Sequence, residues 1–159
     1  MCGVRGALTM RPVRRRIVVA AAAAAALGLL RVADGYAAAE PALSPDDWRA
    51  IQRVIGDQLD ALRAGDAERA FAFAAAGIRA QVGDAPSFMA MVRGGYDALL
   101  VARYTEFLEG AVIDGLVIQP LRLVAPDNTV RVALYTMQRD GGAWRIAGCA
   151  IAPSTVKAA

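Results

Sequence analysis

The stretch 144-WRIAGCAIAP-153 places Cys149 near Trp144 and Arg145, in a chain that contains no histidine. A cysteine beside a cation could act as a nucleophilic thiolate, because a neighbouring positive charge or a helix end lowers the thiol pKa. The competing interpretation is a small apolar strand residue, since cysteine is among the most often buried types. Strict alternation puts Cys149 on the face of Arg145, whereas a bulge at Gly148 would move it to the face of Trp144. We expect an unreactive strand residue.

The absence of histidine also narrows the possible chemistry. Neither a Ser-His-Asp nor a Cys-His arrangement can exist, and the commonest transition-metal ligand is missing. One cysteine in the predicted mature domain cannot build a thiolate zinc site. The sequence contains no GxxxxGK[ST] phosphate loop and no GxGxxG after a predicted strand. We therefore predict no catalytic residue, no metal site and no cofactor.

The segment Arg93-Gly94-Gly95-Tyr96 follows an apolar helical pattern and is a candidate binding loop. If it lies at the mouth of a pocket, Arg93 could meet an anionic ligand. The alternative is a helix C-terminus, where an arginine stabilises the negative end of the helix dipole. We favour the helix end and keep Arg93 and Tyr96 as candidate ligand-binding residues.

The first 39 residues have the three parts of an export signal. Arg14, Arg15 and Arg16 form a cationic segment, residues 17–30 form an apolar run of 14 residues, and Ala37-Ala38-Ala39 offers small residues before a cut at Glu40. A retained membrane anchor is the alternative, but a spanning helix needs about 20 apolar residues. We predict residues 1–39 to be a cleaved signal peptide of a periplasmic or secreted protein that touches the membrane only transiently.

Residues 40–159 are predicted to form a single domain, since about 120 residues can bury a sizeable core. The whole chain has a net charge of +3, but 12 of its 18 basic and 14 of its 15 acidic residues fall in this segment, which makes it slightly acidic. Its arginines are scattered among acids instead of forming a basic run. We therefore expect no nucleic-acid partner.

The first half of this domain reads as three helices. Ser44-Pro45 begins the first, and apolar residues then recur at three- and four-residue steps until Gly65. Asp66 begins a second helix over residues 67–76, and Asp84 begins a third that ends at Gly94-Gly95. The aromatic and methionine residues of these helices could line a pocket or simply form core: Phe71, Phe73, Phe88, Met89 and Met91.

The second half is predicted to form four strands, over residues 103–113, 116–124, 129–139 and 143–152. Turn signals separate them at Asp114-Gly115, at Pro126-Asp127-Asn128 and at Asp140-Gly141-Gly142. Strands with short links pair as an antiparallel meander. Pro120 lacks an N–H donor, so it predicts an edge position or a bulge in its strand. The expected fold is α+β, with three N-terminal helices packed on a curved four-stranded antiparallel meander.

Three segments carry a resemblance to a known family: LSPDDWRAIQRVIGDQLDALRAGDAERAFAFA, FMAMVRGGY and VALYTMQRDGGAWRIAGC. Over residues 43–152 the chain resembles a small, uncharacterised bacterial family of unknown function. That family is placed with the nuclear transport factor 2-like, or cystatin-like cone, superfamily. Members of this fold include isomerases, dehydratases, ligand binders and interaction modules, so the resemblance implies a fold and not an activity. The family pattern has a proline-bearing loop after Tyr96, where this chain reads DALLV.

The cone fold implied by the resemblance encloses a pocket between a curved sheet and helices. Enzymes of that superfamily often use a carboxylate with a raised pKa and a tyrosine that donates to an oxyanion. The available residues are Tyr96, Tyr104, Tyr135, Asp97 and Glu106. Alternatively, the tyrosines pack with their hydroxyl groups at the rim and the acids are solvated. We take the tyrosines as candidate ligand-binding residues.

The expected function is non-catalytic: an exported module that binds a small apolar or amphipathic ligand, or a partner protein. One alternative is an isomerase or lyase with a carboxylate-tyrosine pair in the cone pocket. The other is a homodimeric interaction scaffold that pairs through the exposed face of the sheet. A filled interior would contradict the enzyme and the small-ligand hypotheses alike.

Overall fold

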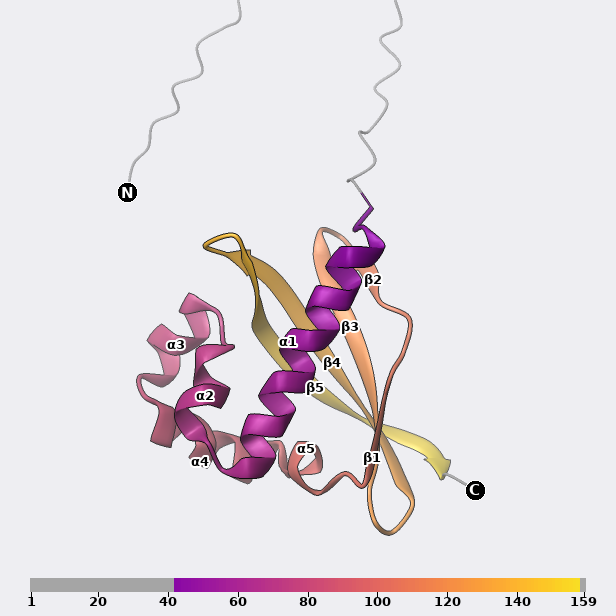
Figure 1. Ribbon diagram of the computed structural model, residues 1–159. Coiled ribbons are helices and arrows are strands. Elements are labelled where there is room, and N and C mark those ends of the chain that lie inside the picture. The colour runs from indigo at the N-terminus through magenta and orange to yellow at the C-terminus, as the bar shows by residue number, and fades with distance from the viewer. Residues whose placement is uncertain (1–41, 158–159) are drawn as a thin grey trace, which may run out of the picture. The chain divides into compact units, whose positions relative to one another are not determined.

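The computed structural model describes residues 42–157, with side chains over residues 42–152. The predicted signal peptide, residues 1–39, lies outside the described residues. Within them the chain is α+β, with helices packed on an antiparallel sheet (Figure 1). The helices are α1 (Pro45–Ala64), α2 (Ala67–Ala72), α3 (Ala76–Val82), α4 (Ala85–Gly95) and α5 (Asp97–Val101). The strands are β1 (Tyr104–Phe107), β2 (Ala111–Ile113), β3 (Leu116–Val124), β4 (Thr129–Asp140) and β5 (Ala143–Lys157).

Helix α1 begins and ends where the sequence predicts. The Ser44 side chain accepts a hydrogen bond from the Asp47 backbone N–H, and the Asp47 carboxylate accepts one from the Ser44 backbone, which together form a capping box. Gly65 ends the helix at a φ of 75°, a left-handed conformation that glycine adopts without strain. The buried face of the helix includes Ile51 and Ile55, both 0% exposed. Figure 1 shows α1 lying across one face of the sheet.

The expected second helix is in fact two helices, α2 and α3. Residues 73–75 leave the helix between them and run parallel to Ile146 of β5. The Ala75 N–H donates to the Ile146 carbonyl, and the Ile146 N–H donates to the Phe73 carbonyl. Asp140 then caps α3 by accepting a hydrogen bond from the Ala76 N–H at 2.9 Å. The break thus satisfies backbone groups on the edge of β5, a long-range effect that local helical periodicity does not reveal.

The segment after Tyr96 also differs from the expectation of three helices. Asp97-Ala98-Leu99-Leu100-Val101 is the short helix α5, and Leu99 is buried at 3% exposure. Five helices therefore replace the predicted three in the described part of the chain.

The sheet is antiparallel throughout, with the order β1-β3-β4-β5 and with β2 also paired to β3. The predicted first strand is split into β1 and β2, so the sheet has five strands and not four. Pro120 lies opposite this interruption, and its carbonyl accepts from the Leu108 N–H. In an antiparallel strand the N–H and the carbonyl of one residue point to the same neighbouring strand. An N–H at position 120 would therefore point to the gap between β1 and β2, so the proline costs no strand hydrogen bond.

The helices cover one face of the sheet and leave the other open. On the covered face, Leu121, Ala133 and Tyr135 are at most 1% exposed. On the open face, Leu134 is 37% exposed and Leu116 is 54% exposed. None of the helices in residues 42–157 has the length and hydrophobicity needed to cross a bilayer.

Candidate functional site

The interior of the domain holds a cavity of about 280 Å³. Its walls come from α1, α3 and α4 on one side and from β4 and β5 on the other. Among its lining residues, Leu62 of α1 and Ile146 of β5 are each 3% exposed, whereas Gln81 and Met91 are exposed. Most of the lining is apolar, which is typical of sites for small molecules.

Tyr135 lines the cavity and is the most buried polar group there. Its side chain is 0% exposed, and its hydroxyl has no hydrogen-bond partner among the described residues. Burial raises the pKa of the Tyr135 phenol well above its usual range, and the nearby Cys149 thiol adds to the effect. The hydroxyl is therefore neutral at physiological pH, able to donate a hydrogen bond and without a protein acceptor. Most buried polar groups in proteins are hydrogen-bonded, so this one is a candidate ligand contact.

A bulge in β5 brings Cys149 to the same cavity. Thr136 pairs with Gly148 and Met137 pairs with Ile146, so Ala147 is an extra residue. The bulge reverses the alternation, and Cys149 pairs with Tyr135 on the covered face. Strict alternation would have put Cys149 on the opposite face; a bulge, the alternative considered at Gly148, is present one residue earlier, at Ala147.

The surroundings of Cys149 are those of an unreactive thiol. Burial raises the pKa of the Cys149 thiol to about 12. Arg145 does not line the cavity, and burial is the cause of the raised pKa. The thiolate, which is the nucleophilic form, is therefore rare at neutral pH.

We expect Cys149 to react slowly with a thiol reagent while the protein is folded. With a native thiol pKa of about 12 against an ordinary value of 9.0, the thiolate fraction at pH 8 falls by about a thousandfold, so labelling should be at least about a hundredfold slower than in urea. A Cys2→Ser variant leaves Cys149 as the single thiol. Rates are measured by maleimide labelling and mass spectrometry with and without urea. Equal rates would show that the bulge leaves the thiol open to solvent.

The four candidate ligand-binding residues separate into two groups. Tyr96, which follows α4, and Tyr135 both line the cavity. Arg93 is exposed in the last turn of α4, where a cation stabilises the negative end of the helix, and it does not line the cavity. Tyr104 lies on the edge strand β1 and is 54% exposed. The structure thus brings together two of the four residues.

The candidate acids are solvated and lie away from the cavity. Asp97 is 3.9 Å from Arg131 in an exposed ion pair, and Glu106 is 2.8 Å from Arg122 across β1 and β3. Exposed pairs of this kind contribute little to stability. Among residues 42–152, no acidic side chain lines the cavity.

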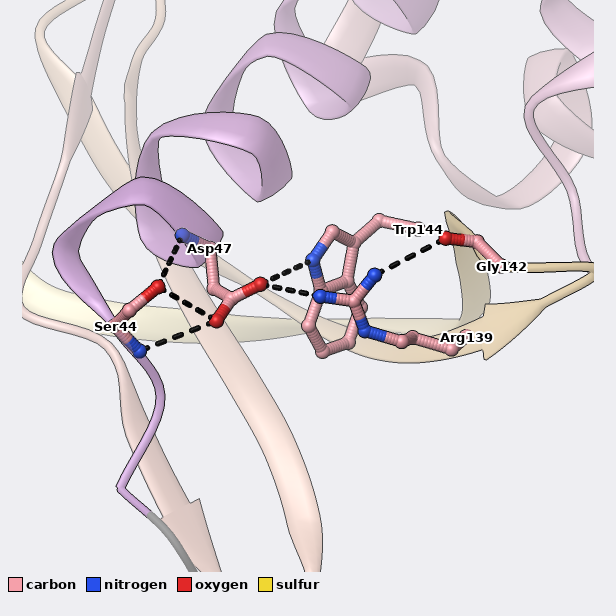
Figure 2. Close-up of polar contacts among 5 residues, drawn as sticks. All are labelled: Ser44, Asp47, Arg139, Gly142 and Trp144. Atoms are coloured by element: carbon pink, nitrogen blue, oxygen red, sulfur yellow. Dashed lines mark hydrogen bonds and ion pairs between the residues drawn. The ribbon is translucent and has the colours of Figure 1, made fainter.

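A separate polar cluster joins the start of α1 to the β4–β5 hairpin (Figure 2). The Asp47 carboxylate accepts from the Ser44 hydroxyl at 2.7 Å, from the Trp144 indole N–H at 3.3 Å and from Arg139. Arg139 also lies 4.6 Å from the Trp144 ring centroid and donates to the Gly142 carbonyl. The hydrogen bond from the Ser44 side chain is the main cause of the lowered Asp47 pKa. None of these residues lines the cavity, so the cluster holds the fold together.

Two buried glutamines were not among the candidate residues predicted from the sequence. Gln58 of α1 is 4% exposed, lines the cavity and donates to the Ala70 carbonyl at 3.2 Å. Gln119 of β3 is 0% exposed and donates to the carbonyls of Leu108 and Pro120. In both cases the signal was a polar residue at a position that the periodicity assigns to an apolar face.

The comparison with family models gives one match over most of the chain. The model of a domain of unknown function (DUF4864) matches residues 44–159, which include every helix and strand from α1 to β5. No curated protein and no solved structure matches the chain significantly. The uncharacterised family expected from the sequence is thereby confirmed, and the chain belongs to the DUF4864 family.

Proposed function

We propose that this domain binds a small apolar ligand in the cavity between α1, α3, α4 and the sheet, without catalysing a reaction. The observation that carries the proposal is the cavity of about 280 Å³, lined mainly by apolar side chains and by Tyr135, whose hydroxyl has no partner among the described residues. An engineered apolar cavity of about 150 Å³ is large enough to bind benzene, so this one can hold a larger molecule.

The enzymatic alternative needs a carboxyl group beside a tyrosine in the cavity. The acids considered for that role, Asp97 and Glu106, instead form exposed ion pairs. The polar side chains of the lining are Gln58, Gln81, Tyr96, Tyr135 and Cys149, none of which replaces a carboxylate as a general base at neutral pH. This composition favours binding over acid-base catalysis.

A second candidate function is association through the open face of the sheet, either with a partner protein or with a second copy of the chain. The observation that favours it is the exposure of Leu116 and Leu134 on that face. We further propose that the family belongs with the nuclear transport factor 2-like folds, because a helix layer and an antiparallel sheet enclose a pocket. Export to the periplasm or the exterior is part of the same proposal and rests on residues 1–39.

Binding can be tested with N-phenyl-1-naphthylamine, a neutral probe whose fluorescence rises in apolar surroundings. We expect saturable binding at one site per chain. A Val92→Phe substitution should weaken it by about tenfold or more, because Val92 is 3% exposed in the cavity wall and a larger ring would fill part of the space. Titration of the probe into each protein measures both quantities.

The matched control is Val132→Phe, the same enlargement on the open face of β4, which should leave probe binding unchanged. Thermal unfolding verifies that both variants are folded. Native mass spectrometry of the exported protein reports any co-purified ligand and the oligomeric state. Absence of saturable binding, or equal loss in both variants, would contradict binding in this cavity.

A further inference from the structure

The polar groups of the cavity wall point to a particular kind of ligand. Tyr135 lines the cavity and is 0% exposed, and its hydroxyl has no partner among the described residues, so an acceptor carried by a bound ligand would satisfy this donor. Leaving such a buried group unpaired is costly, whereas a bound acceptor removes the cost. The other buried polar side chain of the wall, Gln58, already donates to the Ala70 carbonyl. Tyr135 is thus the polar anchor that the described wall offers.

Within residues 42–152, no charged side chain lines the cavity. Its polar residues are neutral: two glutamines, two tyrosines and a thiol. A carboxylate or an ammonium group moved from water into such a site loses hydration without contacting an opposite charge in the wall. Arg63 is near enough to lower the Tyr135 pKa, against the larger effect of burial, but it does not line the cavity. Arg93, the cation once considered for an anionic ligand, lies outside the wall. The site therefore discriminates against charged molecules.

We infer that the ligand is a neutral, largely apolar molecule that presents one hydrogen-bond-accepting oxygen, such as a ketone or ester carbonyl, to the Tyr135 hydroxyl. This inference rests on the proposed ligand-binding function and specifies its chemistry. The apolar body of the ligand fills the space between Leu62, Phe88 and Ile146, and the oxygen meets the hydroxyl. A hydrocarbon can fill the same space but leaves the hydroxyl unpaired.

The test compares two probes with one skeleton, butylbenzene and butyrophenone, on the wild type and on Tyr135→Phe. The two probes differ in hydrophobicity, so the measured quantity is the ratio of their affinities in each protein, as in a double-mutant cycle. We expect Tyr135→Phe to lower the ketone-to-hydrocarbon ratio by roughly tenfold, with butylbenzene affinity unchanged within about twofold. Isothermal titration, or displacement of N-phenyl-1-naphthylamine, gives the affinities.

Three further measurements test the interpretation. Tyr104→Phe removes a hydroxyl from an exposed residue of β1 outside the cavity wall and should leave the ratio unchanged. With the wild type alone, the infrared carbonyl stretch of bound butyrophenone should lie at lower frequency than in an alkane solvent, because a hydrogen bond weakens the C=O bond. The anion 4-phenylbutyrate should bind at least about tenfold more weakly than butyrophenone at pH 7.

The outcomes distinguish a failure of this inference from a failure of the proposed ligand binding. If neither butylbenzene nor butyrophenone binds, ligand binding in the cavity is wrong and the inference fails with it. If butylbenzene binds but the ratio is the same in the wild type and in Tyr135→Phe, the cavity binds ligands and only the role of Tyr135 is wrong. An unshifted carbonyl band, or tighter binding of 4-phenylbutyrate than of butyrophenone, would also overturn the inference.

Discussion

Replacing Trp144 by alanine is expected to lower the free energy of unfolding by about 3–5 kcal/mol. The side chain is 7% exposed and belongs to the main hydrophobic core, so its removal leaves a large cavity. It also ends the hydrogen bond from the indole N–H to Asp47 and the stacking of Arg139 on the ring. The start of α1 and the β4–β5 hairpin would then lose the residue that joins them (Figure 2). Urea denaturation followed by circular dichroism measures the change.

Trp144→Phe is the matched control, because it retains most of the apolar volume but removes the indole N–H. We expect it to lower the free energy of unfolding clearly less than the alanine variant does, because the phenyl ring keeps most of the contacts in the core. Arg139→Ala should cost least, since that side chain is 53% exposed and its pairing with Asp47 is screened by solvent. A loss below about 1 kcal/mol for Trp144→Ala would mean that the core closes without this residue.

The fold class could be predicted from the sequence because its signals are local. Ser44 and Gly65 mark the two ends of α1, and the capping box and the left-handed glycine are both present. The turn at Asp114-Gly115 has φ angles of 50° and 76°, which suits the tight hairpin expected from those residue types. The counts of helices and strands could not be predicted in the same way. The break at residues 73–75 depends on pairing with Ile146, which is distant in sequence.

The candidate site was predictable in residue type but not in geometry. Tyr135 was a candidate, but its strand has apolar residues on both faces, so alternation alone does not tell which face the helices cover. Val132 and Leu134 lie on the open face although their neighbours on the covered face are no more apolar. Cys149 reaches the cavity only because the bulge at Ala147 inserts one residue. Arg93 and Tyr104 were chosen for their chemistry, and their exposure follows from a helix end and an edge strand.

Replacing Gln119 by leucine is expected to lower the free energy of unfolding by about 1–3 kcal/mol, although leucine is more apolar and similar in size. The Gln119 amide donates to the Leu108 carbonyl at 2.7 Å and to the Pro120 carbonyl at 3.0 Å, at the point where β1 and β2 separate. The Pro120 carbonyl also accepts from the Leu108 N–H, so the glutamine adds a second donor there and supplies one to the Leu108 carbonyl. Gln119 is 0% exposed, so a leucine there removes this donor at a buried position.

Gln52→Leu is the control, because Gln52 donates to Gln119 over a long 3.4 Å contact and is only partly buried. Its effect should stay within about 0.5 kcal/mol.

A Gln119→Glu variant gives a second test, because a carboxylate cannot donate to either carbonyl. Burial should raise the pKa of the introduced carboxyl group above its value of about 4.3 in the unfolded chain. Ionisation then favours the unfolded chain, so stability should fall as pH rises from 4 to 7, a slope that the wild type lacks at this position. A Gln119→Leu variant as stable as the wild type would show that the break between β1 and β2 does not depend on the glutamine. A Gln119→Glu variant without that pH slope would show that the side chain reaches solvent.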